Sequence, residues 1–241
     1  YNGFAFLSEK ILQEIWKMKI NAVIFDMDGL MFDTERLMKA GWEKASREMG
    51  FTLTEYHLSQ MRGGTRERSS KLFEKWFDGA VDYDRGRAIR TQYQREYIEQ
   101  HGVPLKKGLM ELLTYLKDHR IPAAVATSTA RSEASRYWDM AGVTPYITAS
   151  VCGDEVTKGK PDPEIFLTAA EKLQTPPKQC LILEDSLNGI RAAKAAGAWS
   201  CMVPDLTPAV DEIRPFCDLI CEDLSRVIPY LDSCGSSLQS P

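Results

Sequence analysis

Residues 20–30 read INAVIFDMDGL, an apolar run that ends in two aspartates and a glycine. Uninterrupted apolar runs are typical of parallel strands that are buried on both faces of a sheet. Similar segments occur at residues 121–126, 147–152, 180–183 and 199–203. The stretches between them carry apolar residues at helical spacing, as at residues 109–116. This alternation of strand and helix predicts an α/β fold with a doubly wound, Rossmann-like parallel sheet as its core.

The stretch at 35–102 departs from this alternation. It contains no convincing buried strand, it is rich in charged and aromatic residues, and its helical patterns lie around 37–49, 69–77 and 87–100. We therefore expect an inserted helical cap domain at 35–102 and a core built from residues 1–34 and 103–241. Residues 1–17 have an amphipathic pattern and are expected to form an N-terminal helical extension.

The composition excludes several classes of protein. Lys and Arg total 30 against 34 Asp and Glu, a net charge of −4, so we expect no nucleic-acid partner. No apolar run approaches the roughly 20 residues of a membrane-spanning helix, so we expect no membrane partner. The six cysteines form no C-x-x-C pair and the three histidines are scattered, which argues against a zinc site. We expect reduced cysteines, a cytoplasmic location and a monomer.

Acidic pairs follow two of the predicted strands. Asp26 and Asp28 end the first apolar run, and Glu184 and Asp185 end the fourth. Because the carboxyl ends of parallel strands meet at one edge of a sheet, these four carboxylates are expected to converge. Alone, the first pair could equally form a strand-end turn. Together, the two pairs predict an oxygen-rich site for a hard cation such as Mg²⁺.

Anion-binding groups follow the same pattern. Thr127 and Ser128 come directly after the second run, and their hydroxyls could bind phosphate oxygens. Lys160 precedes a predicted helix, where its charge can hold an anion or keep an aspartate ionised. Singly, these residues would be read as a turn and a surface lysine. Their joint occurrence at successive strand ends favours a phosphate site.

These motifs resemble, in order, the four motifs of the haloacid dehalogenase superfamily. The matching elements are DMDGLMFDT at 26–34, Thr127, KPDP at 160–163 and Glu184-Asp185. Within that superfamily the chain is similar to the β-phosphoglucomutase-like group, whose helical cap follows the first motif. The stretch at 35–102 matches that cap in position and size.

The resemblance implies a role for each motif residue in phosphoryl transfer. Asp26 would be the nucleophile and Asp28 the general acid/base. Thr127 would bind the transferring phosphate, while Lys160 would neutralise it and orient Asp26.

The resemblance also implies a metal site. Asp185 would ligate Mg²⁺ together with Asp26 and the backbone carbonyl of Asp28. Glu184 would support the metal.

A loop in the expected cap resembles the substrate-specificity loop of the same group. It reads RGGTR at 62–66, and Arg62, Gly63 and Arg66 would face the substrate. The alternative interpretation is a turn between two helices with solvated arginines. Adjacent glycines suit a loop that lies against a ligand.

Two departures from the mutase pattern decide between reactions. Met38 stands where β-phosphoglucomutases carry a histidine, and Thr129-Ala130 replaces their serine-lysine pair. We therefore predict a Mg²⁺-dependent phosphatase that acts on a small phosphorylated metabolite, for example a sugar phosphate, through an aspartyl-phosphate. The alternatives are a phosphosugar mutase and a non-catalytic phosphate-binding module. Asp28 argues against the binding module, because a stable aspartyl-phosphate needs no acid/base, and the acidic cluster argues against dehalogenation.

Overall fold

The computed structural model describes residues 19–62, 64–206, 211 and 213–235. In this part of the chain, six parallel strands form one sheet in the order β3-β2-β1-β4-β5-β6. The strands are β1 (Ala22–Phe25), β2 (Ala123–Ala126), β3 (Ala149–Val151), β4 (Cys180–Glu184), β5 (Trp199–Met202) and β6 (Leu219–Ile220). The five apolar runs correspond to β1–β5. The sequence did not predict β6, which is two residues long and half exposed.

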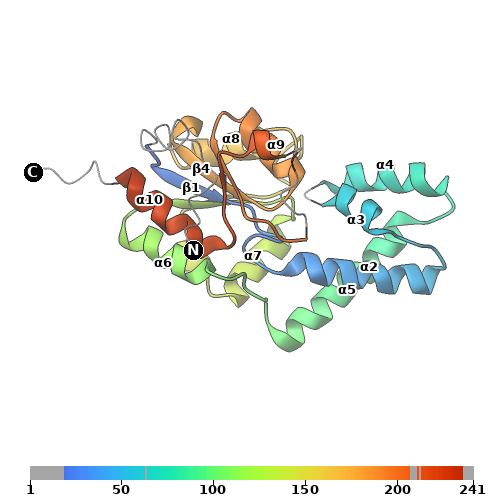
Figure 1. Cartoon of the computed structure of the whole chain (residues 1–241). Coiled ribbons are helices and arrows are strands. Elements are labelled where there is room, and N and C mark those ends of the chain that lie inside the picture. Colours follow the sequence, from blue (N-terminus) through green and yellow to red (C-terminus); the bar gives the residue numbers. More distant parts are fainter. Residues whose placement is uncertain (1–18, 63, 207–210, 212, 236–241) are drawn as a thin grey trace, which may run out of the picture.

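Helices cover both faces of the sheet (Figure 1). One face packs against α6 (Leu109–Asp118), α7 (Arg131–Met140) and α10 (Ile228–Gly235), and the other against α8 (Glu164–Lys172) and α9 (Leu187–Ala195). Strand β1 contributes to the hydrophobic cores on both faces. Val23 and Phe25 belong to the core beneath α6, α7 and α10, and Ala22 and Ile24 belong to the core beneath α8 and α9. The doubly wound α/β prediction is confirmed. Short 3-10 helices are η1 (Thr144–Tyr146), η2 (Pro177–Gln179), η3 (Arg214–Phe216) and η4 (Leu224–Val227).

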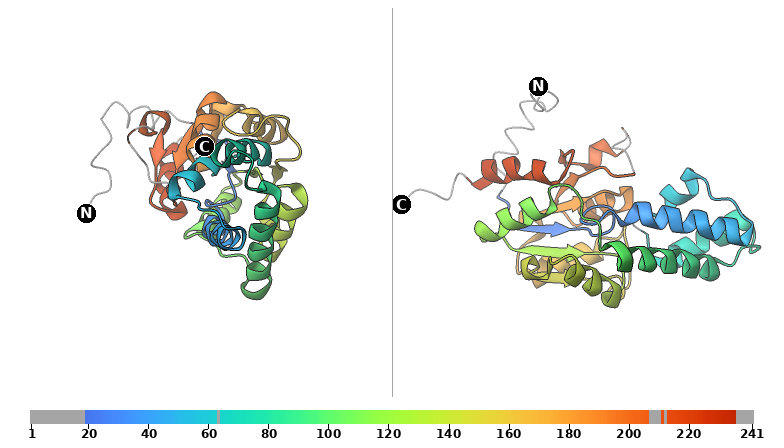
Figure 2. Two further views of the ribbon diagram at one scale, coloured as in Figure 1. Left: turned by 90° about the vertical axis from the view of Figure 1, so that its right-hand side faces the viewer. Right: turned by 90° about the horizontal axis from the view of Figure 1, so that it is seen from below.

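A helical insert separates β1 from β2 in the chain. It contains α2 (Thr34–Met49), α3 (Glu55–Met61), α4 (Arg66–Phe77) and α5 (Tyr83–His101), and it extends to one side of the sheet (Figure 2). The segment that leads into the insert and the segment that leads out of it are joined by backbone hydrogen bonds. The Asp33 N–H donates to the Pro104 carbonyl at 2.9 Å, and the Lys106 N–H donates to the Met31 carbonyl at 2.9 Å. The division into core and cap domains stays a prediction.

Some sequence predictions concern residues that lie outside the described ones. These are the N-terminal helical extension at 1–17 and Gly63 of the expected specificity loop. Among the described residues, no helix combines the length and the apolar character needed to cross a bilayer.

The helical insert has its own aromatic core, and its stability should depend on Phe73. This side chain is fully buried, with ring centroids 5.1 Å from Trp42 and 5.0 Å from Tyr83. Phe73→Ala should lower the free energy of unfolding by about 3–5 kcal/mol, because it removes buried area and leaves a cavity. The control Tyr56→Ala removes an exposed ring and should change it by less than about 0.5 kcal/mol. Urea unfolding measures both, and equal losses would contradict the assignment.

Candidate active site

The predicted site residues meet where the strand order reverses direction. Strands β1 and β4 are neighbours at the centre of the sheet, and the chain continues outward from them on opposite sides. Asp26 follows β1, Glu184 ends β4, Asp185 comes next, and Thr127 follows β2. Ligands of open α/β sheets bind at such a crevice, beyond the carboxyl ends of the strands. The expected convergence of these residues is therefore observed.

A buried ammonium group lies at the centre of the site. Lys160 Nζ donates to Asp26 Oδ1, to Glu184 Oε1 at 2.7 Å and to the Ala126 carbonyl at 3.1 Å. These three bonds use all three protons of the ammonium. Burial alone would lower the pKa of Lys160, but the charges of Asp26 and Glu184 raise it above its usual value. Lys160 therefore stays charged and fixes one oxygen of Asp26.

Glu184 is held as firmly as Lys160. Its Oε2 accepts the backbone N–H groups of Asp185 at 3.0 Å and Ser186 at 2.9 Å, and the Ser186 hydroxyl at 2.9 Å. Gly189 makes this placement possible, because a Cβ on that residue would lie 1.8 Å from the Glu184 carboxylate. With both oxygens engaged, Glu184 is suited to orient its neighbours.

Three buried carboxylates can hold a metal ion. Oxygens of Asp26, Glu184 and Asp185 lie within 4.8 Å of one another. Burial raises the pKa of Asp26 to about 8, against the opposing charge of Lys160, and burial together with Glu184 raises that of Asp185 well above its usual range. Gly29 leaves room beside them, since a Cβ there would lie 2.3 Å from Asp185 Oδ2. One ammonium does not balance three carboxylates, so the donor set fits a hard divalent cation.

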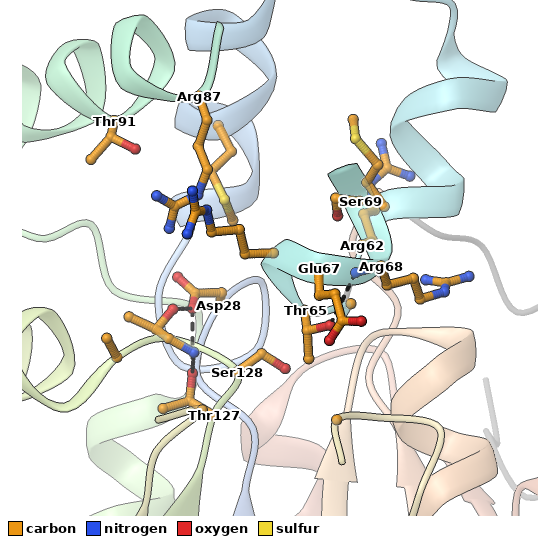
Figure 3. Close-up of a pocket in the computed structure, with 18 of the residues that line it drawn as sticks. Asp28, Arg62, Thr65, Glu67, Arg68, Ser69, Arg87, Thr91, Thr127 and Ser128 are labelled. Carbon is orange, nitrogen blue, oxygen red and sulfur yellow. Dashed lines mark hydrogen bonds between the residues drawn. The ribbon is translucent and has the colours of Figure 1, made fainter. Parts of the chain in front are cut away.

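Hydroxyl groups position the second aspartate. Asp28 Oδ1 accepts from Thr34 Oγ1 at 2.6 Å. Asp28 Oδ2 accepts from Thr129 Oγ1 at 2.7 Å and from Thr127 Oγ1 at 3.5 Å, and Figure 3 shows Asp28 beside Thr127. Sequence reasoning assigned Thr127 to phosphate and overlooked Thr34 and Thr129 as partners of Asp28. Thr34 belongs to the first motif, which is the signal that could have identified it.

A cavity of about 1100 Å³ connects this centre with the helical insert. Asp26, Asp28, Thr127 and Ser128 line its core side, and residues of α2, α4 and α5 line the other (Figure 3). Of the described insert residues on this wall, nine are basic and Glu35 and Glu67 are acidic. The basic ones are Lys39, Arg62, Arg66, Arg68, Lys71, Lys75, Arg87, Arg90 and Arg95. A basic wall thus faces an acidic centre.

Both predicted specificity arginines line this cavity, and both are already ion-paired. The buried Arg62 guanidinium contacts Glu55, and its carbonyl accepts the Asn188 amide at 3.0 Å. Arg66 Nη2 lies 2.7 Å from Asp84 Oδ2, with both side chains largely exposed. Arg62 therefore links the insert to helix α9. No sequence pattern predicts this link, because Arg62 and Asn188 are far apart along the chain.

Comparison with known proteins identifies the family. The model of the haloacid dehalogenase-like hydrolases matches residues 20–197. The chain belongs to this hydrolase family. The hydrolase is 34% identical over 181 residues to "Phosphorylated carbohydrates phosphatase" of Thermotoga maritima. The matched region covers 74% of this chain and 82% of the relative.

Solved structures show the same architecture. CbbY from Rhodobacter sphaeroides in complex with phosphate is 26% identical to this hydrolase, with a TM-score of 0.74 over 88% of this chain and 99% of that one. β-Phosphoglucomutase from Clostridium difficile has a TM-score of 0.76 at 20% identity, over 91% of this chain and 99% of that one. The second likeness concerns the fold alone.

The stability of the metal-free hydrolase should depend on pH through Glu35. Burial, reinforced by Asp28 and opposed by Arg62, raises the pKa of Glu35 to about 8 from an unfolded value of 4.5. Between these values the folded state holds a proton that the unfolded state has lost, so stability falls as pH rises. Glu35→Gln should flatten this decline, measured in EDTA as the free energy of urea unfolding from pH 5 to 8.

The exposed Glu43 on the same helix provides the control, because Glu43→Gln should keep the wild-type pH dependence. Identical pH dependence in wild type and Glu35→Gln would show that Glu35 is not the buried acid described.

Proposed function

We propose that this hydrolase is a Mg²⁺-dependent phosphatase that acts on a small phosphomonoester. The observation that carries the proposal is the placement of Asp26, bound by the buried Lys160, beside the hydroxyl-held Asp28 at one end of a cavity. The names of the Thermotoga maritima relative and of the phosphate complex of CbbY support phosphate chemistry. The former also favours a sugar phosphate as the substrate.

The chemistry requires two carboxylates with different tasks. Asp26 Oδ1 is bonded to Lys160, so Oδ2 attacks phosphorus and forms an aspartyl-phosphate as the bond to the leaving oxygen breaks. Asp28 acts as the general acid that gives a proton to that oxygen, and then as the base that takes one from the water that attacks the aspartyl-phosphate. Inorganic phosphate leaves and Asp26 is regenerated. Thr34 and Thr129 keep Asp28 in place through both steps.

The remaining core residues serve the anion and the metal. Thr127, Ser128 and Lys160 are assigned to the phosphate, with Lys160 acting through Asp26. Asp26, Asp185 and the Asp28 carbonyl would hold Mg²⁺, which supplies positive charge against the transferring phosphoryl group.

The helical insert is proposed to act as a cap over the reaction. Thr65, at the start of α4, lies against the loop that carries Lys160, since a Cβ on Gly159 would lie 2.0 Å from Thr65 Cγ2. Closure of such a lid excludes water and selects the substrate. Arg62, Gly63 and Arg66 are assigned to this selection, Arg62 through the position of the loop.

The mutase and binding-module alternatives have less support. A mutase must exclude water as the phosphoryl acceptor, and Met38 and Ala130 stand where the mutases carry a histidine and a lysine. A binding module would not need the hydroxyl-held Asp28. The cytoplasmic location and the monomeric state stay predictions.

Asp26→Asn should lower kcat/KM for p-nitrophenyl phosphate by about a thousandfold or more, because the amide is not a nucleophile. The matched control is Asp118→Asn on the exposed end of α6, which should keep wild-type activity. Phosphate release in the presence of Mg²⁺ measures both. Equal activity of wild type and Asp26→Asn would reject the proposal.

Removal of divalent cations should also stop the reaction. EDTA should lower phosphate release to background, because no divalent cation then offsets the charge of the phosphoryl group. Added Mg²⁺ should restore phosphate release. Binding has a separate readout: Mg²⁺ should raise the Tm of wild type and leave that of Asp185→Asn unchanged. A wild-type Tm that does not respond to Mg²⁺ would argue against the metal site.

A further inference from the structure

Two arginines of the cavity wall differ from their neighbours. Arg87 and Arg90 lie one turn apart on α5, so they share a face of the helix. Among the described residues, no carboxylate lies within 4 Å of either guanidinium, whereas most other basic groups of the wall have an acidic partner. The paired ones are Lys39, Arg62, Arg66, Lys71 and Arg95.

The surroundings of Arg90 satisfy its charge incompletely. Nη1 donates to Gln94 Oε1 at 3.1 Å, and the guanidinium lies 6.0 Å from the Trp42 ring centroid. The buried Nε has no hydrogen-bond partner, and neither has the hydroxyl of the adjacent Thr91. Burial and the like charge of Arg87 lower the pKa of Arg90. Both side chains are half-buried, and a partly desolvated cation without a counter-ion is unfavourable, so this pair is suited to receive an anion.

The cavity provides the path for that anion. It is one space lined by Asp26 and Asp28 at the core end and by Arg87 and Arg90 at the insert end. Arg87 extends from α5 toward Asp28 (Figure 3). Asp28 and Glu35 attract Arg90 from beyond ion-pair distance, so neither carboxylate occupies the place of a ligand.

We propose that Arg87 and Arg90 form a second anion-binding subsite, so that the substrate is a phosphomonoester with another acidic group. That group is a carboxylate or a second phosphate, which two adjacent guanidinium groups can bind through paired hydrogen bonds. The inference rests on the proposed phosphatase function and defines its substrate class. It adds a second selecting element on α5 to the one assigned to the loop that carries Arg62 and Arg66.

The test compares substrates that differ in one acidic group. One pair is sorbitol 6-phosphate and 6-phosphogluconate, two open-chain compounds of which the second carries a carboxylate at C1. The other is fructose 6-phosphate and fructose 1,6-bisphosphate, which adds a phosphate. In at least one pair the wild type should favour the doubly acidic member about tenfold or more in kcat/KM, because hydrogen bonds between charged groups contribute that much. The pair that shows the preference identifies the group.

Variants then locate the subsite. Arg87→Gln and Arg90→Gln should each lower that kcat/KM ratio about tenfold, mainly through the doubly acidic substrate. The control Arg85→Gln removes an exposed arginine of the same helix, and it should leave the ratio unchanged.

Different failures have different meanings. If the wild type hydrolyses p-nitrophenyl phosphate but prefers neither doubly acidic substrate, the subsite is wrong and the phosphatase function stands. A preference that survives both variants also overturns the subsite. If no phosphomonoester is hydrolysed, the phosphatase function itself is wrong, and the substrate class falls with it. The wild-type comparison decides even where a variant fails to fold.

Discussion

The ammonium group of Lys160 ties together the ends of three strands. Its bonds reach Asp26 after β1, the carbonyl of Ala126 at the end of β2 and Glu184 at the end of β4. A charge can be buried at this depth only if it is paired and hydrogen-bonded. Displacement of β1 or β4 would leave a carboxylate without its cation, and displacement of β2 would leave one N–H of Lys160 without its acceptor. The contact that fixes Asp26 for chemistry therefore also fixes the edge of the sheet.

Charge is segregated between the two parts of the molecule. The carboxyl edge of the sheet gathers Asp26, Asp28, Glu184 and Asp185, while the facing wall of the insert is mostly basic. The net charge of −4 conceals this division, because it sums two opposed surfaces. The proposed reaction would use both surfaces, since the phosphoryl group would meet Asp26 and the metal while the remaining negative charge of the ester needs cations.

The parts of the site that follow from strand order could be predicted, and the parts that follow from side-chain packing could not. Parallel strands align their carboxyl ends, so Asp26 and Asp185 were expected to meet before any geometry was known. By contrast, the ion pair between Arg62 and Glu55 depends on how the helices of the insert pack, and no motif predicted it. Within the described part of the chain, Arg87 and Arg90 have no carboxylate at ion-pair distance, and this depends on how the helices pack, which periodicity does not encode.

The central position of β1 has a consequence for how the chain folds. Val23 pairs with Ala123 and Ala22 with Cys180, so the first strand must wait for partners that are far along the chain. Contacts between such distant segments slow folding, because a long loop must close before any pairing is gained. A chain emerging from the ribosome can form the insert helices early. The strand that precedes Asp26 finds its second neighbour only after β4 has been synthesised.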